Sequence, residues 1–388
     1  MAVITPFSAL RFNFSKAGAP ETICCPPYDV IPDASEWTAK SPHNAILLEG
    51  GERLGTSDPY QDAKQTLDEW LRDGTLYFDA APAFYIYEAA FTAQDGVCRV
   101  LRGLTGAMEL SHFSEGTVLP HEYTLSKDRA DRERLMAQTG CQFSPIYGLF
   151  NDPEESVAAL LRPFLAQPPE LSFTMPDGVT HSLRTVSDTE VCEKLTQLFS
   201  DKKIYIADGH HRYETLLHLR EEMGTPNHAM IFLTDMNGDG IDIRATHRVL
   251  SAMTAYDEVS VLRALEKDFY FSNDGVYCWV TGSGRYRFTP RRPFGESSTV
   301  AVLHRDILEP VFGIDAENMA AGETLTYTRS AEEAIALVQT GQAQCAFLLP
   351  PPQMSELRQT VLSGEKMPQK STYFFPKIIT GLFMRKFA

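Results

Sequence analysis

The sequence lacks several patterns that would assign it to a protein class at once. Its seven cysteines show no CxxC pair and no regular spacing, which argues against a disulfide framework and favours reduced thiols in the cytoplasm. No apolar run reaches about 18 residues, so no membrane span is predicted. The opening residues, MAVITPFSALRFNF, show no basic stretch followed by an apolar one, and no signal peptide is expected.

Basic residues are also scarce. The chain has 35 Lys+Arg against 51 Asp+Glu, a formal net charge of −16. Bulk nucleic-acid binding needs a basic surface and is therefore not expected. A small anionic ligand is compatible with this charge if a local group of basic residues opposes the overall field. The sequence has no GxxxxGK[ST] motif, no kinase-type HRDxxxxN loop and no GxSxG motif, so any phosphoryl transfer must use other devices.

The residues that are present predict an α+β protein with mixed sheets and flanking helices. With 388 residues and 43% hydrophobic content, the chain is long enough for two or three domains. Apolar spacing predicts a helix over 58–73 and paired strands over 83–91 and 97–110. Residues 228–234 and 241–250 are expected to pair as strands, and 298–313 to form a strand and then a helix. The pattern changes near residue 250, which predicts an N-terminal part, 1–250, and a C-terminal part, 251–388.

One strand-to-helix joint stands out, in the stretch KIYIADGHHRYETLLHLREEMG. An apolar strand runs into Asp208, which is expected to cap the following helix, and Gly209 allows a ligand to approach the backbone. A helix N-terminus offers free N–H groups and a favourable dipole to anions. His210, His211 and Arg212 add donors, and the arginine fork suits phosphate. A phosphate site is therefore predicted, the alternative being a simple helix cap.

A metal site at the two histidines is the weaker alternative. Adjacent helical side chains diverge by roughly 100°, so His210 and His211 should not share one ion. His210 and Glu214 are four residues apart and could share one, but a third ligand is not evident. No structural metal is predicted.

The segment LPHEYTLSKDRADRERL concentrates charge before and within a predicted helix. His121 and Glu122 precede the helix, where a loop can direct them into a cleft, and Glu122 is a candidate general base. His121, Lys127, Arg129 and Arg132 are candidate phosphate ligands. The alternative is a solvated helix face.

Three further stretches have weaker signals. MPQKSTYFFPK places Lys370, Ser371 and Thr372 where they suit a phosphate or a substrate hydroxyl, the alternative being a sheet edge protected by lysines. PPYDV holds Asp29 in a rigid turn. DMNGDGIDIRAT resembles half of a calcium loop, but its twelfth position is Thr246 and not Glu, so a hairpin turn is favoured.

Taken in order, PPYDVI, LPHEYTLSKDRADR, SPIYGLF, YIADGHHRYET, THRVL and MPQKSTYFFPKIITGL resemble the family catalogued as domain of unknown function 1015. That family usually has Pro-Pro-Lys-Ser-Thr-Trp-Phe at the last motif, where this chain has Pro-Gln-Lys-Ser-Thr-Tyr-Phe. The family is distantly similar to the ParB/sulfiredoxin superfamily, whose Gly-x-x-Arg motif is here Gly209-His210-His211-Arg212. Its members include free-serine kinases that use ATP or ADP, CTP-binding ParB proteins, and sulfiredoxins with a catalytic Cys that this joint does not have.

The resemblance implies a nucleotide-dependent small-molecule kinase acting on an alcohol, with free serine as one candidate acceptor. In this hypothesis Asp208 helps to hold Mg²⁺, and His210, His211 and Arg212 hold the phosphates of ATP or ADP and stabilise the transferring charge. Glu122 is the base, and Lys370 with Ser371 closes the site. The alternatives are a nucleotide-binding regulator without turnover and a phosphoester hydrolase.

Overall fold

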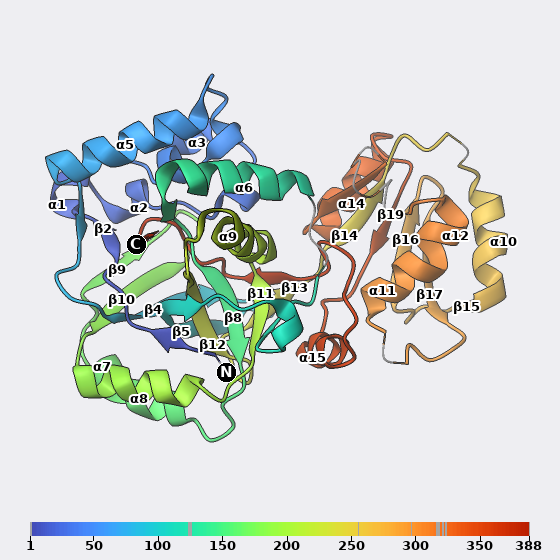
Figure 1. The fold of residues 1–388 in the computed structure, drawn as a ribbon. Coiled ribbons are helices and arrows are strands. Elements are labelled where there is room, and N and C mark those ends of the chain that lie inside the picture. Colours follow the sequence, from blue (N-terminus) through green and yellow to red (C-terminus); the bar gives the residue numbers. More distant parts are fainter. Residues whose placement is uncertain are drawn as a thin grey trace. The chain divides into compact units, whose positions relative to one another are not determined.

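The computed structural model describes residues 2–387 apart from 123–125, 255, 296, 316–318, 320–321 and 323, and for 126–128 only the backbone. The chain forms two compact units (Figure 1). Unit 1 holds Met1–Pro120, Thr124–Asp242 and Pro376–Ala388, and unit 2 holds His121–Tyr123 and Ile243–Phe375. The sequence analysis divided the chain after residue 250. The observed division comes earlier because residues 247–250 pair with strands of unit 2, and the C-terminal residues return to unit 1.

The elements of unit 1 are numbered in chain order. Its strands are β1 (Ile4–Thr5), β2 (Leu10–Phe12), β3 (Leu76–Phe78), β4 (Phe84–Thr92), β5 (Cys98–Glu109), β6 (Val118–Leu119), β7 (Cys141–Gln142), β8 (Ile146–Phe150), β9 (Leu171–Thr174), β10 (Thr180–Val186), β11 (Ile204–Asp208), β12 (His228–Asp235) and β21 (Arg385–Lys386). Its longer helices are α5 (Pro59–Asp73), α6 (Ser126–Thr139), α7 (Ser156–Leu165), α8 (Thr189–Phe199) and α9 (His210–Met223). The short helical segments are α1 (Phe14–Ala17), α2 (Pro20–Ile23), η1 (Tyr28–Val30), α3 (Ser35–Thr38), α4 (Ile46–Glu49), η2 (Gly51–Leu54) and η3 (Phe113–Glu115).

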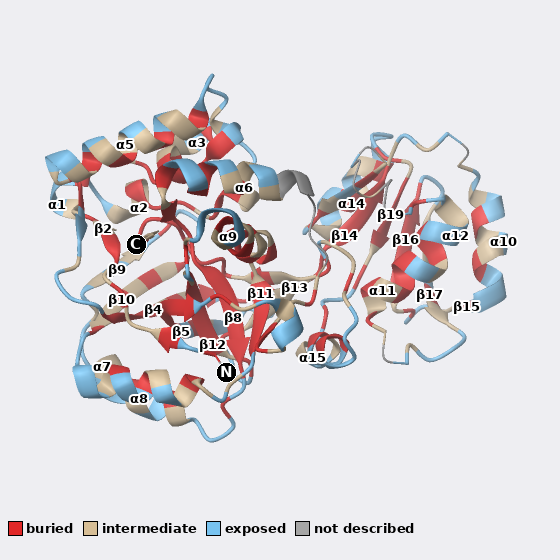
Figure 2. Cartoon of the chain, viewed as in Figure 1, coloured by how far each residue is buried: buried red, intermediate tan, exposed pale blue. Residues whose placement is uncertain are grey.

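The main sheet of unit 1 has the order β6-β11-β8-β12-β5-β4-β10-β9, with β1 also paired to β5. It is mixed, because β6 runs parallel to β11 and β8 parallel to β12, whereas the other described pairs are antiparallel. Its buried side chains form one core with those of α7, α8 and α9. The strands of this sheet are largely buried in Figure 2, while the helices alternate buried and exposed positions, as amphipathic helices do.

Unit 2 is built on an antiparallel six-stranded sheet with the order β15-β17-β16-β19-β14-β18. Its strands are β13 (Asp242–Arg244), β14 (His247–Leu250), β15 (Phe269–Phe271), β16 (Tyr277–Thr281), β17 (Arg285–Pro290), β18 (Leu325–Thr328), β19 (Cys345–Leu348) and β20 (Tyr373–Phe375). Its helices are α10 (Glu258–Asp268), α11 (Thr299–Leu303), the π-helical turn η4 (His304–Leu308), α12 (Glu309–Phe312), α14 (Ala331–Gln339) and α15 (Met354–Leu362). One sheet face packs on α10, α11 and η4, and the other on α14.

The mixed α and β architecture, helix 59–73 and the pairing of β4 with β5 confirm the corresponding predictions. Two expectations are wrong. Residues 228–234 and 241–250 do not pair with each other, because β12 lies between β5 and β8 while β13 pairs with β20 and β14 with β18 and β19. The expected strand near residue 299 is helical, because the Ser298 side chain caps α11 and the β-branched residues that follow pack on the sheet. None of the helices in the described part of the chain is both long and apolar enough to cross a bilayer.

Candidate functional site

The predicted joint between β11 and α9 lies in unit 1, beside the start of β8. Asp208 ends β11 opposite Tyr147, and the turn into α9 is made by Gly209, whose φ of +88° is left-handed. Glycine reaches this region without the steric cost that other residues meet. A Cβ at Gly209 would also lie 3.1 Å from the Arg212 guanidinium. The joint therefore requires glycine both for its backbone and for the packing of the arginine beneath it.

Asp208 does not cap the helix, contrary to the sequence expectation. Its Oδ1 accepts from Lys377 Nζ at 2.7 Å, and its Oδ2 accepts from Arg212 Nη2 at 2.9 Å. Burial alone would raise the pKa of Asp208, but the charges of Lys377 and Arg212 outweigh burial and hold its pKa well below the ordinary value. Two cations therefore pair with this one carboxylate. Lys377 comes from the returning C-terminal segment, so the sequence pattern around Asp208 could not indicate it.

Arg212 is almost fully buried, with 3% of its surface exposed. Besides Asp208, its guanidinium donates to Ser144 Oγ at 2.8 Å and to the Pro145 carbonyl at 2.5 Å. Burial by itself lowers the pKa of Arg212, and nearby carboxylates, Asp208 first and then Asp29, raise it above the ordinary value. Arg212 therefore links α9 to the start of β8, and its described hydrogen bonds are all to protein atoms.

The first turn of α9 has the features of an anion site. Within the described residues, no side chain caps this helix, and the first turn carries no acidic residue. His210 is buried and His211 half-buried in that turn. Backbone N–H groups at a helix start have no partner inside the helix, and the helix dipole gives this end a partial positive charge. The local chemistry therefore favours an anionic group at this end of α9.

Arg132, a predicted phosphate ligand, instead belongs to a buried network of unit 1. Its guanidinium donates to the Glu49 carbonyl at 2.7 Å, pairs with Asp131, and lies 3.6 Å from the centre of the Tyr28 ring. The Glu49 carboxylate accepts from the Ser144 hydroxyl through Oε1 and from the Thr380 hydroxyl through Oε2. Arg132 thus holds the short N-terminal helices against α6.

The remaining predicted residues of α6 add little to a site. Arg129 is half-buried on this helix. The side chain of Lys127 lies outside the described residues.

The segments around Glu122 and Lys370 come together within unit 2. The Glu122 Oε1 accepts from the backbone N–H of Lys370, and the Met367 N–H donates to the His121 carbonyl at 2.7 Å. The buried His121 ring bonds the Thr372 hydroxyl through Nε2 at 2.9 Å. These contacts join two predicted motifs that are about 250 residues apart in the sequence.

The conformation at Lys370 is unusual for its residue type. Its φ is +56°, a left-handed conformation that costs a non-glycine residue energy and occurs preferentially at functional sites. Ser371, which follows it, is fully buried and donates to the Pro368 carbonyl. Ser371 therefore stabilises this turn, which presents the Lys370 N–H to Glu122.

Asp29 is a residue of the joint that the sequence analysis treated only as part of a rigid turn. Its Oδ1 is buried and, among the described residues, has no hydrogen-bond partner. Its charge also contributes to the raised pKa of Arg212, after burial and Asp208. The PPYDV motif was the available signal, but sequence alone could not show that this turn faces Arg212.

The predicted Mg²⁺ ligand does not fit that role. Both carboxylate oxygens of Asp208 already accept hydrogen bonds from cations, which a metal ion would have to displace. Among the described residues, one group could hold a metal: Glu133 on α6 with His218 and Glu222 on α9, whose ligand atoms lie within 4.8 Å of one another. The four-residue spacing considered for His210 and Glu214 is thus found at His218 and Glu222.

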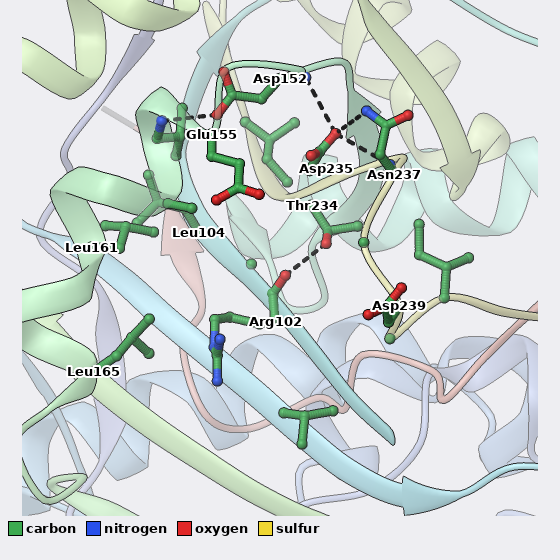
Figure 3. Close-up of a pocket in the computed structure, with 18 of the residues that line it drawn as sticks. Arg102, Leu104, Asp152, Glu155, Leu161, Leu165, Thr234, Asp235, Asn237 and Asp239 are labelled. Carbon is green, nitrogen blue, oxygen red and sulfur yellow. Dashed lines mark hydrogen bonds between the residues drawn. The ribbon is translucent and has the colours of Figure 1, made fainter. Parts of the chain in front are cut away.

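A cavity of about 1540 Å³ lies at the other end of β8, beside α7 (Figure 3). Leu104, Leu161 and Leu165 form part of its apolar wall. Asp235 accepts from the Asp152 N–H at 3.2 Å and the Asn237 amide at 2.9 Å, so these polar groups largely stabilise the turn after β12. Of the residues predicted for the site, none lines this cavity in the described structure.

A protein-family model matches most of the chain. The model of the family described as "Protein of unknown function (DUF1015)" matches residues 4–344. No curated protein matches.

Solved structures show weak similarity. A conserved hypothetical protein from Pyrococcus furiosus is 14% identical with a TM-score of 0.38, covering 68% of this chain and 89% of its own. A free serine kinase in complex with AMP is 14% identical with a TM-score of 0.41, covering 70% and 88%. SbnI with a C-terminal truncation, from Staphylococcus aureus, is 11% identical with a TM-score of 0.40, covering 71% and 85%.

Proposed function

The chain belongs to the DUF1015 family, and we propose that it is a nucleotide-dependent phosphotransferase that binds phosphate groups at the N-terminus of α9. The acceptor in this proposal is a small alcohol, with free serine as the first candidate. The donor is ATP or ADP.

The first turn of α9 is the observation that carries the proposal. It begins at a left-handed Gly209 and, among the described residues, has neither a capping side chain nor an acidic residue. At this end of the helix Lys377 and Arg212 pair with Asp208. A helix start without a side-chain cap and the helix dipole both favour a phosphate over a neutral ligand.

The residues take different roles in this proposal. The N–H groups of the first turn and the side chains of His210 and His211 bind the phosphates. Arg212 and Asp208 position that turn from below instead of contacting the ligand. Glu122, held by the Lys370 N–H, is the general base for the acceptor hydroxyl.

Mg²⁺ is expected to accompany the nucleotide phosphates, because it neutralises charge in most phosphoryl transfers. Asp208 is excluded from this role by its two cationic partners. Asp29 has an oxygen without a hydrogen-bond partner among the described residues and is the better candidate on unit 1. No step of the proposal depends on the ion.

The direct test is to incubate the purified full chain with ATP or ADP, Mg²⁺ and L-serine, and to look for phosphoserine by phosphorus NMR. His211→Ala should reduce the rate at least about tenfold, since a hydrogen bond to a charged group is worth about 1.5–3 kcal/mol. His218→Ala is the matched control: it removes an imidazole from the same helix, about two turns away, and should leave the rate unchanged. Glu122→Gln should abolish phosphoserine while nucleotide binding remains.

Each other result identifies a different function. A rise in melting temperature with nucleotide but no phosphoserine indicates a regulator without turnover. Release of free phosphate alone indicates a phosphoester hydrolase. If ATP, ADP and inorganic phosphate at millimolar concentration all leave the melting temperature unchanged, the phosphate site itself is wrong.

A further inference from the structure

Two packed helices of unit 1 bring three potential metal ligands together. Helices α6 and α9 lie against each other (Figure 1). Glu133 of α6 faces His218 and Glu222 of α9, and one ligand atom from each side chain lies within 4.8 Å of the other two. His218 and Glu222 are four residues apart, so they lie one turn apart on the same face of α9. Zinc-binding helices use two ligands at this spacing.

The distances within this group fit a coordination sphere better than they fit hydrogen bonds. His218 Nε2 lies 3.3 Å from Glu222 Oε1 and 3.6 Å from Glu133 Oε1. Both distances exceed the usual N–H···O range of about 2.7–3.2 Å. Two ligand atoms on a tetrahedral zinc ion stand roughly 3.3–3.6 Å apart when each is about 2.0–2.2 Å from the metal. One ion between these atoms therefore needs small rotations of the side chains and no movement of either helix.

The charges of the group also favour a cation with two charges. In the described part of the chain, the ion-pair partner of Glu133 and of Glu222 is His218, and not a lysine or an arginine. A protonated His218 would balance one of the two carboxylates. A divalent cation balances both of them, and it leaves the imidazole neutral, the form in which histidine binds metals.

We propose that Glu133, His218 and Glu222 form a binding site for a divalent transition-metal ion, with Zn²⁺ as the best match. Zinc binds nitrogen and oxygen ligands together, whereas Ca²⁺ and Mg²⁺ are bound through oxygen. Three protein ligands leave one tetrahedral position, which water fills because His218 and Glu222 are accessible to solvent. The bound ion fastens α6 to α9.

This inference goes beyond the proposed function and does not depend on it. The metal site takes a cation, and it lies about two turns of α9 away from His210, where the phosphate site begins. The phosphoserine assay contains Mg²⁺ and no zinc, so the metal site is empty in that assay and His218→Ala stays a control for it. The sequence analysis predicted no structural metal because no third ligand was evident. Here the third ligand comes from α6, which the spacing along α9 does not indicate.

Zinc binding to the full chain tests the site by isothermal titration, with Mg²⁺ at millimolar concentration and no nucleotide present. Cys98 is the exposed cysteine of the chain, and Cys98→Ser is made in every protein tested so that this thiol does not bind the added zinc. Glu133→Gln, Glu222→Gln and His218→Ala should each weaken zinc binding at least about 100-fold. The reason is that loss of even an outer partner of a metal ligand costs about 10–100-fold in affinity.

His112→Asn is the matched control. His112 is also an accessible imidazole 3.6 Å from a carboxylate of α9, that of Glu221, but among the described residues it pairs with this one carboxylate alone. Asparagine caps helix starts, so it can replace His112 at the start of η3. This variant should bind zinc as tightly as its parent.

A thermal readout tests the link between the helices. Zinc should raise the melting temperature of the parent protein, a chelator should reverse the rise, and the two Glu→Gln variants should not show it. Without metal, these two variants should melt close to the parent, because both glutamates are partly exposed. If His218→Ala does not fold, the two Glu→Gln variants decide the outcome.

Three results would overturn the inference. In the first, zinc binds the parent and all three ligand variants equally, which means that it binds elsewhere. In the second, His112→Asn loses as much affinity as the ligand variants, which means that zinc binds surface imidazoles without selection. In the third, zinc neither binds nor raises the melting temperature, and the group is then an ion pair of a protonated His218 with two carboxylates.

Discussion

Replacing Asp208 by asparagine should destabilise unit 1 far more than its partly exposed position suggests. The side chains of Lys377 and Arg212 are 8% and 4% exposed, and both pair with Asp208. Asparagine keeps the size and one acceptor but removes the negative charge with which both buried cations pair. Breaking a buried ion pair by removing one partner costs about 3–5 kcal/mol.

This free energy corresponds to a large thermal shift. Unit 1 has about 250 residues, and for domains near that size 1 kcal/mol moves the melting temperature by about 2–4 °C. Asp208→Asn should therefore lower the melting temperature of unit 1 by about 6–20 °C in scanning calorimetry. Glu190→Gln is the control: it breaks the exposed pair with Lys194, which should leave the melting temperature unchanged.

A double variant separates charge from packing. Lys377→Met added to Asp208→Asn removes one of the two unpaired cations and restores the net charge of the wild-type joint. The double variant should therefore melt above Asp208→Asn alone, with a coupling free energy of about 1–3 kcal/mol. If Asp208→Asn melts within about 2 °C of the wild type, the cations are hydrated and the description of the joint as a buried ion network is refuted.

The same network makes a prediction about pH. Burial raises and the charges of Lys377 and Arg212 lower the pKa of Asp208, and the lowering is larger. A carboxyl group with a depressed folded-state pKa stabilises the protein above its unfolded pKa, near 4, and loses that contribution as the pH falls towards the folded value. The stability difference between wild type and Asp208→Asn should be constant between about pH 5 and 8 and shrink in more acidic buffer. A difference that grows on acidification would contradict the sign of the shift.

Three further predictions concern single positions. Gly209→Ala should lower the free energy of unfolding by about 1–2 kcal/mol, because alanine is strained at a φ of +88° and its Cβ would press on Arg212. A melting temperature equal to that of the wild type would disprove this strain. Lys370→Gly should leave the free energy of unfolding unchanged or raise it by up to about 1 kcal/mol in urea denaturation, because glycine adopts the left-handed backbone of this position without strain. A clear loss of stability would show that the lysine side chain stabilises the turn. Thr372→Val should cost about 1–2 kcal/mol because the buried His121 loses a hydrogen bond, and Thr372→Ser, which keeps the hydroxyl, should cost much less in the same assay.

The sequence predicted helices and strands correctly where apolar residues recur with a single period. Helix α5 has a capping Asp58, a proline in its first turn and a closing Gly74, all readable in advance. The segment after Ser298 shows the limit, since a run of Val and Ala residues has no period of its own. It is a helix because the Ser298 side chain caps its start and its Val and Leu side chains pack on the sheet, and the spacing of the segment does not reveal that packing.

The sequence by itself determined that a glycine joins a buried strand to a helix with two histidines and an arginine in its first turn, because these are local features. It also determined which segments carry unusual charge. Only the tertiary structure decided which groups those charged side chains contact. Arg212 and Arg132 look alike as phosphate ligands in the sequence, yet both are buried with carbonyl and carboxylate partners from distant segments.

The same reason explains what the sequence missed. Lys377 reaches Asp208 across 169 positions, the Lys370 N–H reaches Glu122 across 248, and the Arg248 Nε–H reaches His304 Nε2 across 56. Electrostatic interactions depend on distance and burial, which a chain acquires only when separate strands and helices pack together. Residue type and spacing therefore identified side chains that can bind anions. The tertiary structure shows which of these side chains already bond to other parts of the protein.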